Sequence, residues 1–379
     1  MNARIFRLGA FFVVVTSVLG SVVGTTVEKA PIEEWNKTFY RGVSAQQTSD
    51  GGYIIVCSTL PKYHEIWLMK TNSNCDEEWT SKTFYVKHTF LSIVRQTSDR
   101  GYIIVCAPGD DAVGLVKMDP NGTEEWFKRF RAKDYHQDEC RSVQQTSDGG
   151  YILAGARTFG SDPFEVQLIK TDANGTKEWI KTFGGSSGES GESVQQTSDG
   201  GYIITGNTLS YGAGKRDVWL IKTDANGTEE WNKTFGGADS DRGNSVQQAS
   251  DGGYIVVGST YSYGAGKQDV WLIKTDANGT EEWNKTFGGA EYDRGNSVQQ
   301  ASDGGYIVVG NTYCYDARKC GVLLIKVREE EVMEEASTPI FTQIPLPTHT
   351  STPEVPAFDV MFFSIAGLLV VTYLLRRKE

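Results

Sequence analysis

A segment of about 51 residues repeats six times along this chain of 379 residues, and this repeat restricts the fold more than any other feature. Repeats of about 40–50 residues that are rich in strand-forming side chains are typical of a β-propeller, in which each copy forms one four-stranded blade. The repeat is marked by a tyrosine that follows glycine in every copy: Tyr53, Tyr102, Tyr151, Tyr202, Tyr254 and Tyr306.

The fifth copy illustrates the four strands that we expect in each blade. They cover residues 244–248, 254–260, 269–275 and 281–287, and the turn sequences "SDGG" and "DANG" separate the first from the second and the third from the fourth. The second and third strands are apolar at consecutive positions, which predicts that both faces are covered. The sequence therefore predicts an all-β, six-bladed propeller of antiparallel blades over residues 25–327. A right-handed β-solenoid is the alternative, although its coils are usually shorter than this repeat.

The sequence "EEWNKTF" stands alone at residues 33–39, whereas at 229–235 and 281–287 it ends a full copy of the repeat. The last copy stops after 322–327 and has no fourth strand of its own. We expect residues 33–39 to pair beside 322–327, which would close the ring in the manner known as Velcro closure and leave no exposed edge at the seam.

One tryptophan recurs in the fourth strand of every copy. Burying a tryptophan removes about 200 Å² from water, so the repeated indoles are expected to hold each blade to its neighbour. These blade-docking residues are Trp35, Trp79, Trp126, Trp179, Trp231 and Trp283.

The two ends of the chain predict an exported, membrane-anchored protein. Residues 1–24 carry Arg4 and Arg7 before an apolar run, which indicates a secretory signal peptide; an uncleaved N-terminal anchor is the alternative. Residues 328–356 are first acidic and then rich in Ser, Thr and Pro, as in an extended stalk. Residues 357–379 form an apolar segment with a basic end, so we expect a transmembrane anchor that holds the propeller outside the cell.

Two families are similar to parts of the sequence. The phrase "TDANGTEEW" resembles the tryptophan-docking repeat of pyrroloquinoline-quinone (PQQ)-like propellers, although their quinoproteins commonly have eight blades and an adjacent cysteine pair that this chain lacks. The C-terminus resembles the PGF-CTERM sorting signal of archaeal surface proteins, with Pro356, Ala357 and Phe358 at the tripeptide and alanine where the family has glycine. "TSDGGYIL" at 146–153 is also similar to the sialidase Asp-box, which is a structural turn.

Composition excludes some partners and suggests some modifications. The net charge of −11 argues against nucleic acid, which requires clustered Lys and Arg. We expect Cys314 and Cys320 to form a disulfide, and Cys57 and Cys106 to be buried free thiols. Export would allow glycosylation at seven Asn-x-Thr sequons, which are Asn36, Asn121, Asn174, Asn226, Asn232, Asn278 and Asn284.

No set of catalytic residues emerges from the sequence, and we expect no cofactor. Asp239 and Asp241 give a weak hint of calcium, and His136, with His64 and His88, an equally weak hint of a metal site; solvated loop residues are the simpler interpretation. Recognition is expected in the variable loops between the second and third strands and in the links between blades. The chain is therefore predicted to be a surface-binding, adhesion or structural module for a glycan or protein ligand. The alternative is an extracellular enzyme, either a glycan hydrolase or a degenerate quinoprotein.

Overall fold

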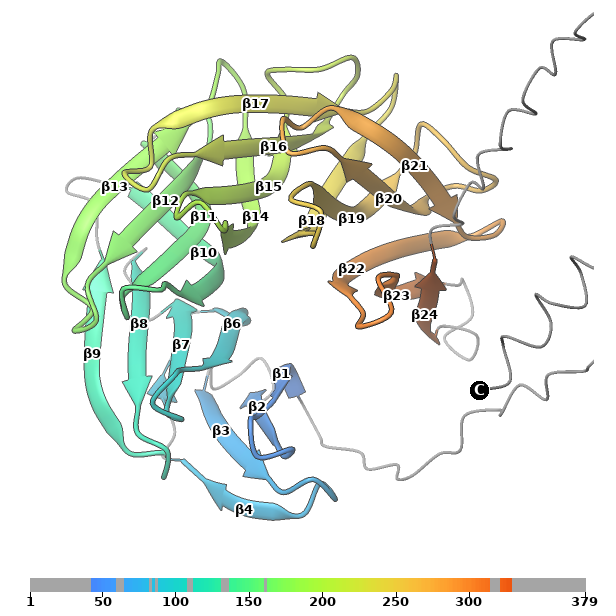
Figure 1. Cartoon of the computed structure of the whole chain (residues 1–379). Coiled ribbons are helices and arrows are strands. Elements are labelled where there is room, and N and C mark those ends of the chain that lie inside the picture. The colour runs from blue at the N-terminus through green and yellow to red at the C-terminus, as the bar shows by residue number, and fades with distance from the viewer. Residues whose placement is uncertain are drawn as a thin grey trace, which may run out of the picture. The chain divides into compact units, whose positions relative to one another are not determined.

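The protein is a six-bladed, all-β propeller, as the repeat predicted. A computed structural model describes residues 42–58, 65–81, 84–85, 88–107, 112–130, 136–159, 162–313 and 321–328. Each blade is one antiparallel sheet in which the strands pair in chain order, except that β5 pairs with β3. Figure 1 shows the sheets following one another around a common centre, with the first strand of each blade innermost and the fourth outermost.

The strands have the following bounds. Blades 1 to 3 contain β1 (Gly42–Gln47), β2 (Tyr53–Ser58), β3 (Glu65–Thr71), β4 (Glu77–Thr80) and β5 (Phe84–Tyr85); β6 (His88–Gln96), β7 (Tyr102–Ala107), β8 (Val113–Met118) and β9 (Glu124–Phe130); and β10 (His136–Gln145), β11 (Tyr151–Phe159), β12 (Glu165–Thr171) and β13 (Lys177–Phe183). Blades 4 to 6 contain β14 (Glu189–Gln196), β15 (Tyr202–Thr208), β16 (Asp217–Thr223) and β17 (Glu229–Phe235); β18 (Asp241–Gln248), β19 (Tyr254–Thr260), β20 (Asp269–Thr275) and β21 (Glu281–Phe287); and β22 (Tyr292–Gln300), β23 (Tyr306–Tyr313) and β24 (Gly321–Val327).

Three of the four strands expected in the fifth copy have the predicted bounds, and the first is longer than expected. Strand β18 begins at Asp241 rather than at residue 244, because its pairing with β19 continues past an irregularity between Gly243 and Ser245. Residues that the sequence placed in links between blades therefore lie in a strand, where their side chains take fixed directions. This extension matters for the site described below.

The core lies between blades and is formed by the second and third strands. All seven residues of β15, β16, β19 and β20 are buried, which confirms that both faces of these strands are covered. Ile203 and Leu220 of blade 4 pack in one cluster with Val256 and Trp271 of blade 5. Each blade is thus buried by its neighbour, as the absence of alternation predicted.

The repeated tryptophans dock each blade onto the next. Trp231 of blade 4 meets Tyr254 of blade 5, with ring centroids 5.8 Å apart, and a Cβ on the hairpin glycine Gly279 of blade 5 would lie 2.6 Å from the same indole. The same ring contact joins Trp79 to Tyr102, Trp126 to Tyr151, Trp179 to Tyr202 and Trp283 to Tyr306. Trp35 lies outside the described residues.

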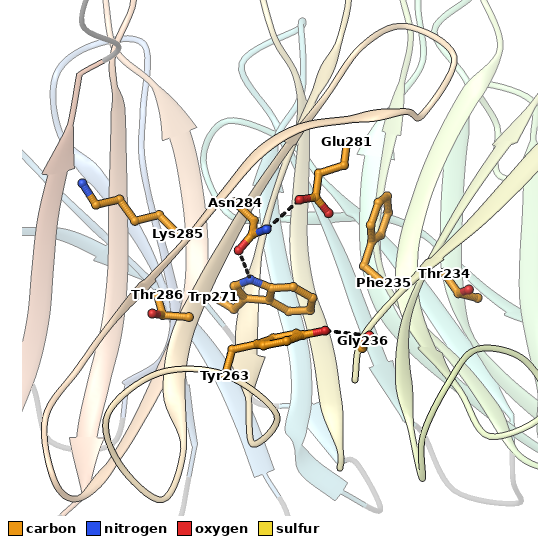
Figure 2. Close-up of a pocket in the computed structure, with 9 residues that line it drawn as sticks. All are labelled: Thr234, Phe235, Gly236, Tyr263, Trp271, Glu281, Asn284, Lys285 and Thr286. Carbon is orange, nitrogen blue, oxygen red and sulfur yellow. Dashed lines mark hydrogen bonds between the residues drawn. The ribbon is translucent and has the colours of Figure 1, made fainter. Parts of the chain in front are cut away.

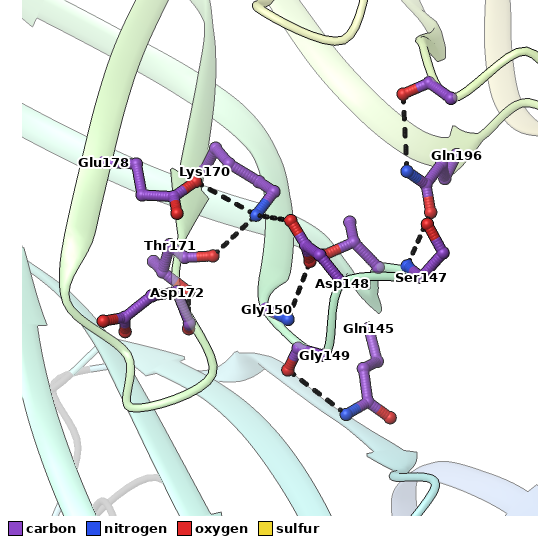
Figure 3. A network of polar contacts seen from close by, with 12 residues as sticks. Gln145, Ser147, Asp148, Gly149, Gly150, Lys170, Thr171, Asp172, Glu178 and Gln196 are labelled. Carbon is purple, nitrogen blue, oxygen red and sulfur yellow. Dashed lines mark hydrogen bonds and ion pairs between the residues drawn. The ribbon is translucent and has the colours of Figure 1, made fainter.

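A buried lysine in the third strand ties together the two hairpins of each blade. In blade 3 the Nζ of Lys170 lies 2.8 Å from Asp148 in the "SDGG" turn and 3.1 Å from Glu178 in β13, and it donates to the carbonyl of Thr171 (Figure 3). The equivalent side chains in blades 1 to 5 are only 1–5 % exposed: Lys70, Lys117, Lys170, Lys222 and Lys274. The aspartates of these turns therefore have a structural role in blades 1 to 5.

Blade 6 differs from the others among the described residues. Its sheet has three strands, and the lysine of its third strand, Lys326, pairs with Asp303 but has a side chain that is 32 % exposed. Val322 and Leu324 of β24 are exposed by 79 % and 69 %. Residues 33–39, which were expected to complete this sheet, lie outside the described residues.

Candidate functional site

The central channel is lined by the first strand of each blade. The sequence "SVQQ" or a variant of it ends these strands, and its serine and glutamine side chains surround a cavity of about 470 Å³. The backbone N–H of Gln196 in blade 4 donates to the Oε1 of Gln144 in blade 3. The Oε1 of Gln196 accepts in turn from Ser147 N of blade 3 (Figure 3). The glutamines are therefore largely occupied in joining neighbouring blades.

One side chain in this channel breaks the pattern. Arg95 of β6 takes the position of Gln144. A guanidinium only donates hydrogen bonds, so Arg95 cannot accept one from a backbone N–H of the next blade as Gln144 does. Burial lowers the pKa of Arg95, and no carboxylate of the described residues contributes to this shift. Arg95 thus places a positive charge in a channel that is otherwise lined by neutral amides, hydroxyls and valines.

A second cavity, of about 390 Å³, lies where the first strands of blades 3 to 5 begin. Most of its charged and amide side chains differ between the equivalent positions of blades 3 to 5, in contrast to "SVQQ". We call it the blade-specific cavity; its polar side chains include Glu139, Arg141, Glu189, Glu192, Asn207, Arg216 and Arg242.

The three carboxylates of the blade-specific cavity all have partners. Arg141 donates to Glu139 at 2.8 Å and also pairs with Glu192, which accepts from Ser190 and Asn207 as well. Glu189, only 2 % exposed, accepts from the hydroxyl of Thr208 and from two backbone N–H groups. The carboxylates are therefore held in fixed positions and have their charges balanced by donors.

Two guanidiniums of the same cavity have no such partners. Within the part of the chain that the structure describes, the guanidiniums of Arg216 and Arg242 donate no hydrogen bond and form no ion pair. The Nε of Arg242 is buried without an acceptor, as are those of Arg141 in the same cavity and of Arg294 at the equivalent position of blade 6. Burial lowers the pKa of Arg216, the nearby charge of Arg242 lowers it further, and the charge of Glu192 opposes this shift without reversing it. The unmet polar groups at this place are thus positively charged donors.

A different hollow, of about 710 Å³, lies on the outside between blades 4 and 5 (Figure 2). The Tyr263 ring lies 5.3 Å from that of Trp271, and its hydroxyl donates to the carbonyl of Gly236 in blade 4. Tyr211 makes the same bond to Gly184 one blade earlier. Because the arrangement repeats, it is best explained as a structural contact that holds neighbouring blades together.

The described sequons fall into two groups. Asn232 and Asn284 lie in fourth strands, where the Asn284 amide accepts from Trp271 and donates to Glu281 (Figure 2); Asn232 does the same with Trp219 and Glu229. A hairpin tip exposes each of the others, which are Asn121, Asn174, Asn226 and Asn278. Asn232 and Asn284 are exposed as well, so the two groups differ in the hydrogen bonds of the side-chain amide and not in whether they are exposed. Asn36 lies outside the described residues.

The residues with a weak metal signal are not brought together. Asp239 pairs with Lys215 at 2.9 Å, whereas Asp241 is fully buried and accepts from Gly237 N and from the Ser262 hydroxyl. His136 begins β10, two blades before Asp241. Among the described residues, no group of three or more His, Cys, Asp or Glu side chains is placed to hold a metal ion.

Cys57 and Cys106 are buried and free, as expected, and so are Cys75 and Cys140. The proposed pair Cys314 and Cys320 lies outside the described residues, as do the stalk, the anchor and the tripeptide Pro356, Ala357 and Phe358. In the described ranges no helix is long and apolar enough to span a bilayer.

Comparison with solved structures gives similarity of fold. A protein of unknown function from Dyadobacter fermentans covers 76 % of this chain and 97 % of its own, with 11 % identity and a TM-score of 0.49. The periplasmic gluconolactonase PpgL of Pseudomonas aeruginosa covers 73 % and 82 %, with 12 % identity and a TM-score of 0.47. The Pan2 WD40 domain of Neurospora crassa covers 75 % and 78 %, with 10 % identity and a TM-score of 0.45. No family model and no curated protein matches the chain.

The loops between second and third strands, where recognition was expected, supply Phe164, Leu209 and Arg216 to the blade-specific cavity. The contribution of the first strands was not predicted, although a signal was present. Comparing the copies at the position directly before "SVQQ" gives Arg141, Glu192, Asn244 and Asn296, and the position two residues earlier gives Glu139, Ser190, Arg242 and Arg294. From the sequence alone, these positions are placed in the links between blades and not in strands. Once the first strands are known to begin earlier, alternation directs these residues to one face.

Proposed function

We propose that this protein is a ligand-binding module and that the blade-specific cavity is its binding site. One observation carries the proposal: charged side chains from blades 3 to 5, most of which differ between these blades, converge on one cavity, whereas the channel repeats "SVQQ" with the exception of the first two blades. A rigid scaffold with one group of non-repeating polar residues is the arrangement expected of a binding site. The ligand is a small polar molecule or the end of a surface glycan or protein.

Binding is favoured over catalysis by the state of the carboxylates. Glycan hydrolysis needs one carboxyl group free to donate a proton and a second placed across the scissile bond. Glu139 and Glu192 are both held by Arg141, and Glu189 is occupied by three donors. A degenerate quinoprotein remains the alternative that the resemblance to PQQ-like repeats suggests, and no residue of the cavity favours it.

The binding site can be tested by exchanging one residue for its counterpart in another blade. Glu192→Asn places in blade 4 the residue that blades 5 and 6 already carry there, so the fold should tolerate it. The full chain, purified in detergent, would be screened on glycan arrays and by thermal shift against polar small molecules. We expect ligands of the wild type to lose binding in Glu192→Asn. Equal binding by both proteins, or turnover in a parallel hydrolysis screen, would overturn the proposal.

We also propose that residues 33–39 complete blade 6 and close the ring. In blade 5 the third-strand lysine, Lys274, pairs with Asp251 and with Glu282 of the fourth strand. Lys326 has the aspartate but no described glutamate, and Glu34 is the matching residue of "EEWNKTF". The exposed Val322 and Leu324 give this strand an apolar surface to cover.

Paired alanine variants test the closure. Trp231→Ala removes a docking indole that the structure describes, and Trp35→Ala removes its proposed counterpart. If the ring closes as proposed, both variants lose about 2 kcal/mol or more of unfolding free energy, since partly buried aromatic side chains contribute on this scale. A loss for Trp231→Ala without one for Trp35→Ala would show that residues 33–39 do not dock.

The location at the cell surface remains a proposal supported by the sequence of the two ends. We place the propeller outside the cell, on the stalk of residues 328–356 and anchored by residues 357–379, with the tripeptide at 356–358 acting as an archaeal-type sorting signal. Protease treatment of intact cells that express the full chain should release the propeller. Retention of an intact, protected protein would contradict this location.

A further inference from the structure

We propose that the ligand of the blade-specific cavity carries a compact oxyanion, a carboxylate or phosphate, which binds between Arg216 and Arg242. This inference rests on the proposed function and specifies the chemistry of the group that is bound. It follows from an imbalance within the cavity: every carboxylate there is engaged, whereas two of its three guanidiniums are not.

The positions of the two arginines explain why they are available. Arg216 directly precedes β16, and its carbonyl accepts from Asp241 N at 2.6 Å, so the backbone fixes it beside the strand that carries Arg242. Both side chains are only partly exposed, and the Nε of Arg242 lacks an acceptor. Two adjacent guanidiniums that are partly withdrawn from water are unfavourable unless an anion lies between them.

The donor geometry of arginine identifies the class of ligand. A guanidinium offers five N–H donors in a planar fork and accepts nothing, which matches the two or three oxygens of a carboxylate or phosphate. Glu192 and Asn207 are fixed next to this place by their own hydrogen bonds and can hold further polar groups of the ligand. Leu209, which is 43 % exposed, supplies an apolar wall. The cavity therefore fits an acidic sugar or a phosphorylated small molecule.

The two arginines without carboxylate partners contrast with the negative net charge of the whole chain. A protein with a net charge of −11 repels anions on average, and many of its described lysines are paired with carboxylates. The cavity lining holds three carboxylates and three guanidiniums, so its formal charge is zero rather than negative. Arg216 and Arg242, which have no carboxylate partner, are the groups left to attract an anion.

Counterpart residues within the chain provide the test variants. Arg242→Ser installs the residue of blade 4, Ser190, and Arg216→Gln installs the residue of blade 5, Gln268. Arg294→Ser is the matched control: Arg294 holds the same place in blade 6 as Arg242 in blade 5, donates to Asn244, and does not line the cavity. Thermal unfolding of all variants would establish that each is folded.

Isothermal titration of the full chain with glucuronate, inorganic phosphate and glucose, at low ionic strength, would test the inference. We expect glucuronate, phosphate or both to bind, glucose to bind at least tenfold more weakly, and either arginine variant to weaken anion binding at least tenfold while Arg294→Ser does not. Tighter binding of glucuronate than of phosphate would identify a carboxylate ligand, and the reverse a phosphate.

The inference is overturned if neither anion binds the wild type, or if they bind all four proteins equally. The proposed function has a separate outcome, because the array screen uses Glu192→Asn. If array ligands depend on Glu192 but not on the two arginines, the cavity is the site and its ligand is not an anion. If they depend on none of these residues, both proposals fail.

Discussion

Trp231 lies so close to Gly279 of the next blade that a Cβ atom on this glycine would be 2.6 Å from the indole ring. Gly279 also has a φ of 76°, in the left-handed region that glycine tolerates best. Glycine is therefore required at position 279 for two reasons: the backbone has a positive φ, and the indole of the neighbouring blade leaves no space for a Cβ.

These two demands can be separated by comparing two glycines. Gly252 has a φ of 89° and open space where a Cβ would lie, so Gly252→Ala should cost about 1 kcal/mol through backbone strain alone. Gly279→Ala adds the collision with Trp231 and should cost about 1–3 kcal/mol more. Chemical denaturation measures both, and equal costs would show that the indole moves aside freely.

Acid should weaken the protein through the aspartates of the "SDGG" turns. Burial raises the pKa of Asp199, but hydrogen bonds from Lys222, Thr197 and Gly201 N outweigh it and lower the pKa from 3.8 to about 2. A lowered pKa stabilises the folded state above pH 3.8, and this contribution is lost as the pH falls toward 2.

Asp199→Asn tests that contribution. The carboxylate is about half exposed, so screening should limit the loss at neutral pH to about 1 kcal/mol or less. The difference between wild type and variant, measured by urea unfolding at pH 7 and pH 2.5, should shrink at the lower pH. A difference that grows on acidification would contradict the ion-pair explanation.

Arg95→Gln should stabilise the protein. Glutamine at this position would offer the Oε1 that Gln144 offers to Gln196 N, and it would remove a guanidinium from the channel. The gain should be about 1 kcal/mol, the usual net value of one hydrogen bond. The reverse change, Gln247→Arg, removes the acceptor of Gln300 N and should destabilise by a similar amount. The Nη1 of Arg95 donates to the carbonyl of Val94 at 3.0 Å, and a destabilised Arg95→Gln would show that losing this bond outweighs the bond gained.

The thiols should be unreactive in the folded protein. Burial raises the pKa of Cys106 and of Cys140 from 9.0 to about 12, so the thiolate is scarce at pH 8. Titration with a thiol reagent should find Cys57, Cys75, Cys106 and Cys140 only after denaturation. If Cys314 and Cys320 are linked, these four react without a reductant and all six react with one; six without a reductant would rule out the disulfide.

The sequence predicted the blades but only part of the lining of the site, for a physical reason. Hydrophobic runs such as β20 and turns such as that of Gly279 recur along the chain. Each copy therefore has the same strand and turn preferences and forms the same kind of sheet. A cavity depends instead on which unlike residues, such as Arg216 and Arg242, meet across blades. That meeting depends on where β18 begins, and strand ends are set by tertiary pairing as well as by local composition.

The contact between each indole and the following hairpin has a consequence for how such a chain can grow. Every internal blade places its tryptophan against the next blade and its hairpin against the tryptophan of the blade before. A duplicated blade inserted into the ring would therefore fit both of its neighbours without further change. Ring size is then limited by curvature and by the seam, and a lineage of these proteins could gain or lose whole units while each junction stays intact.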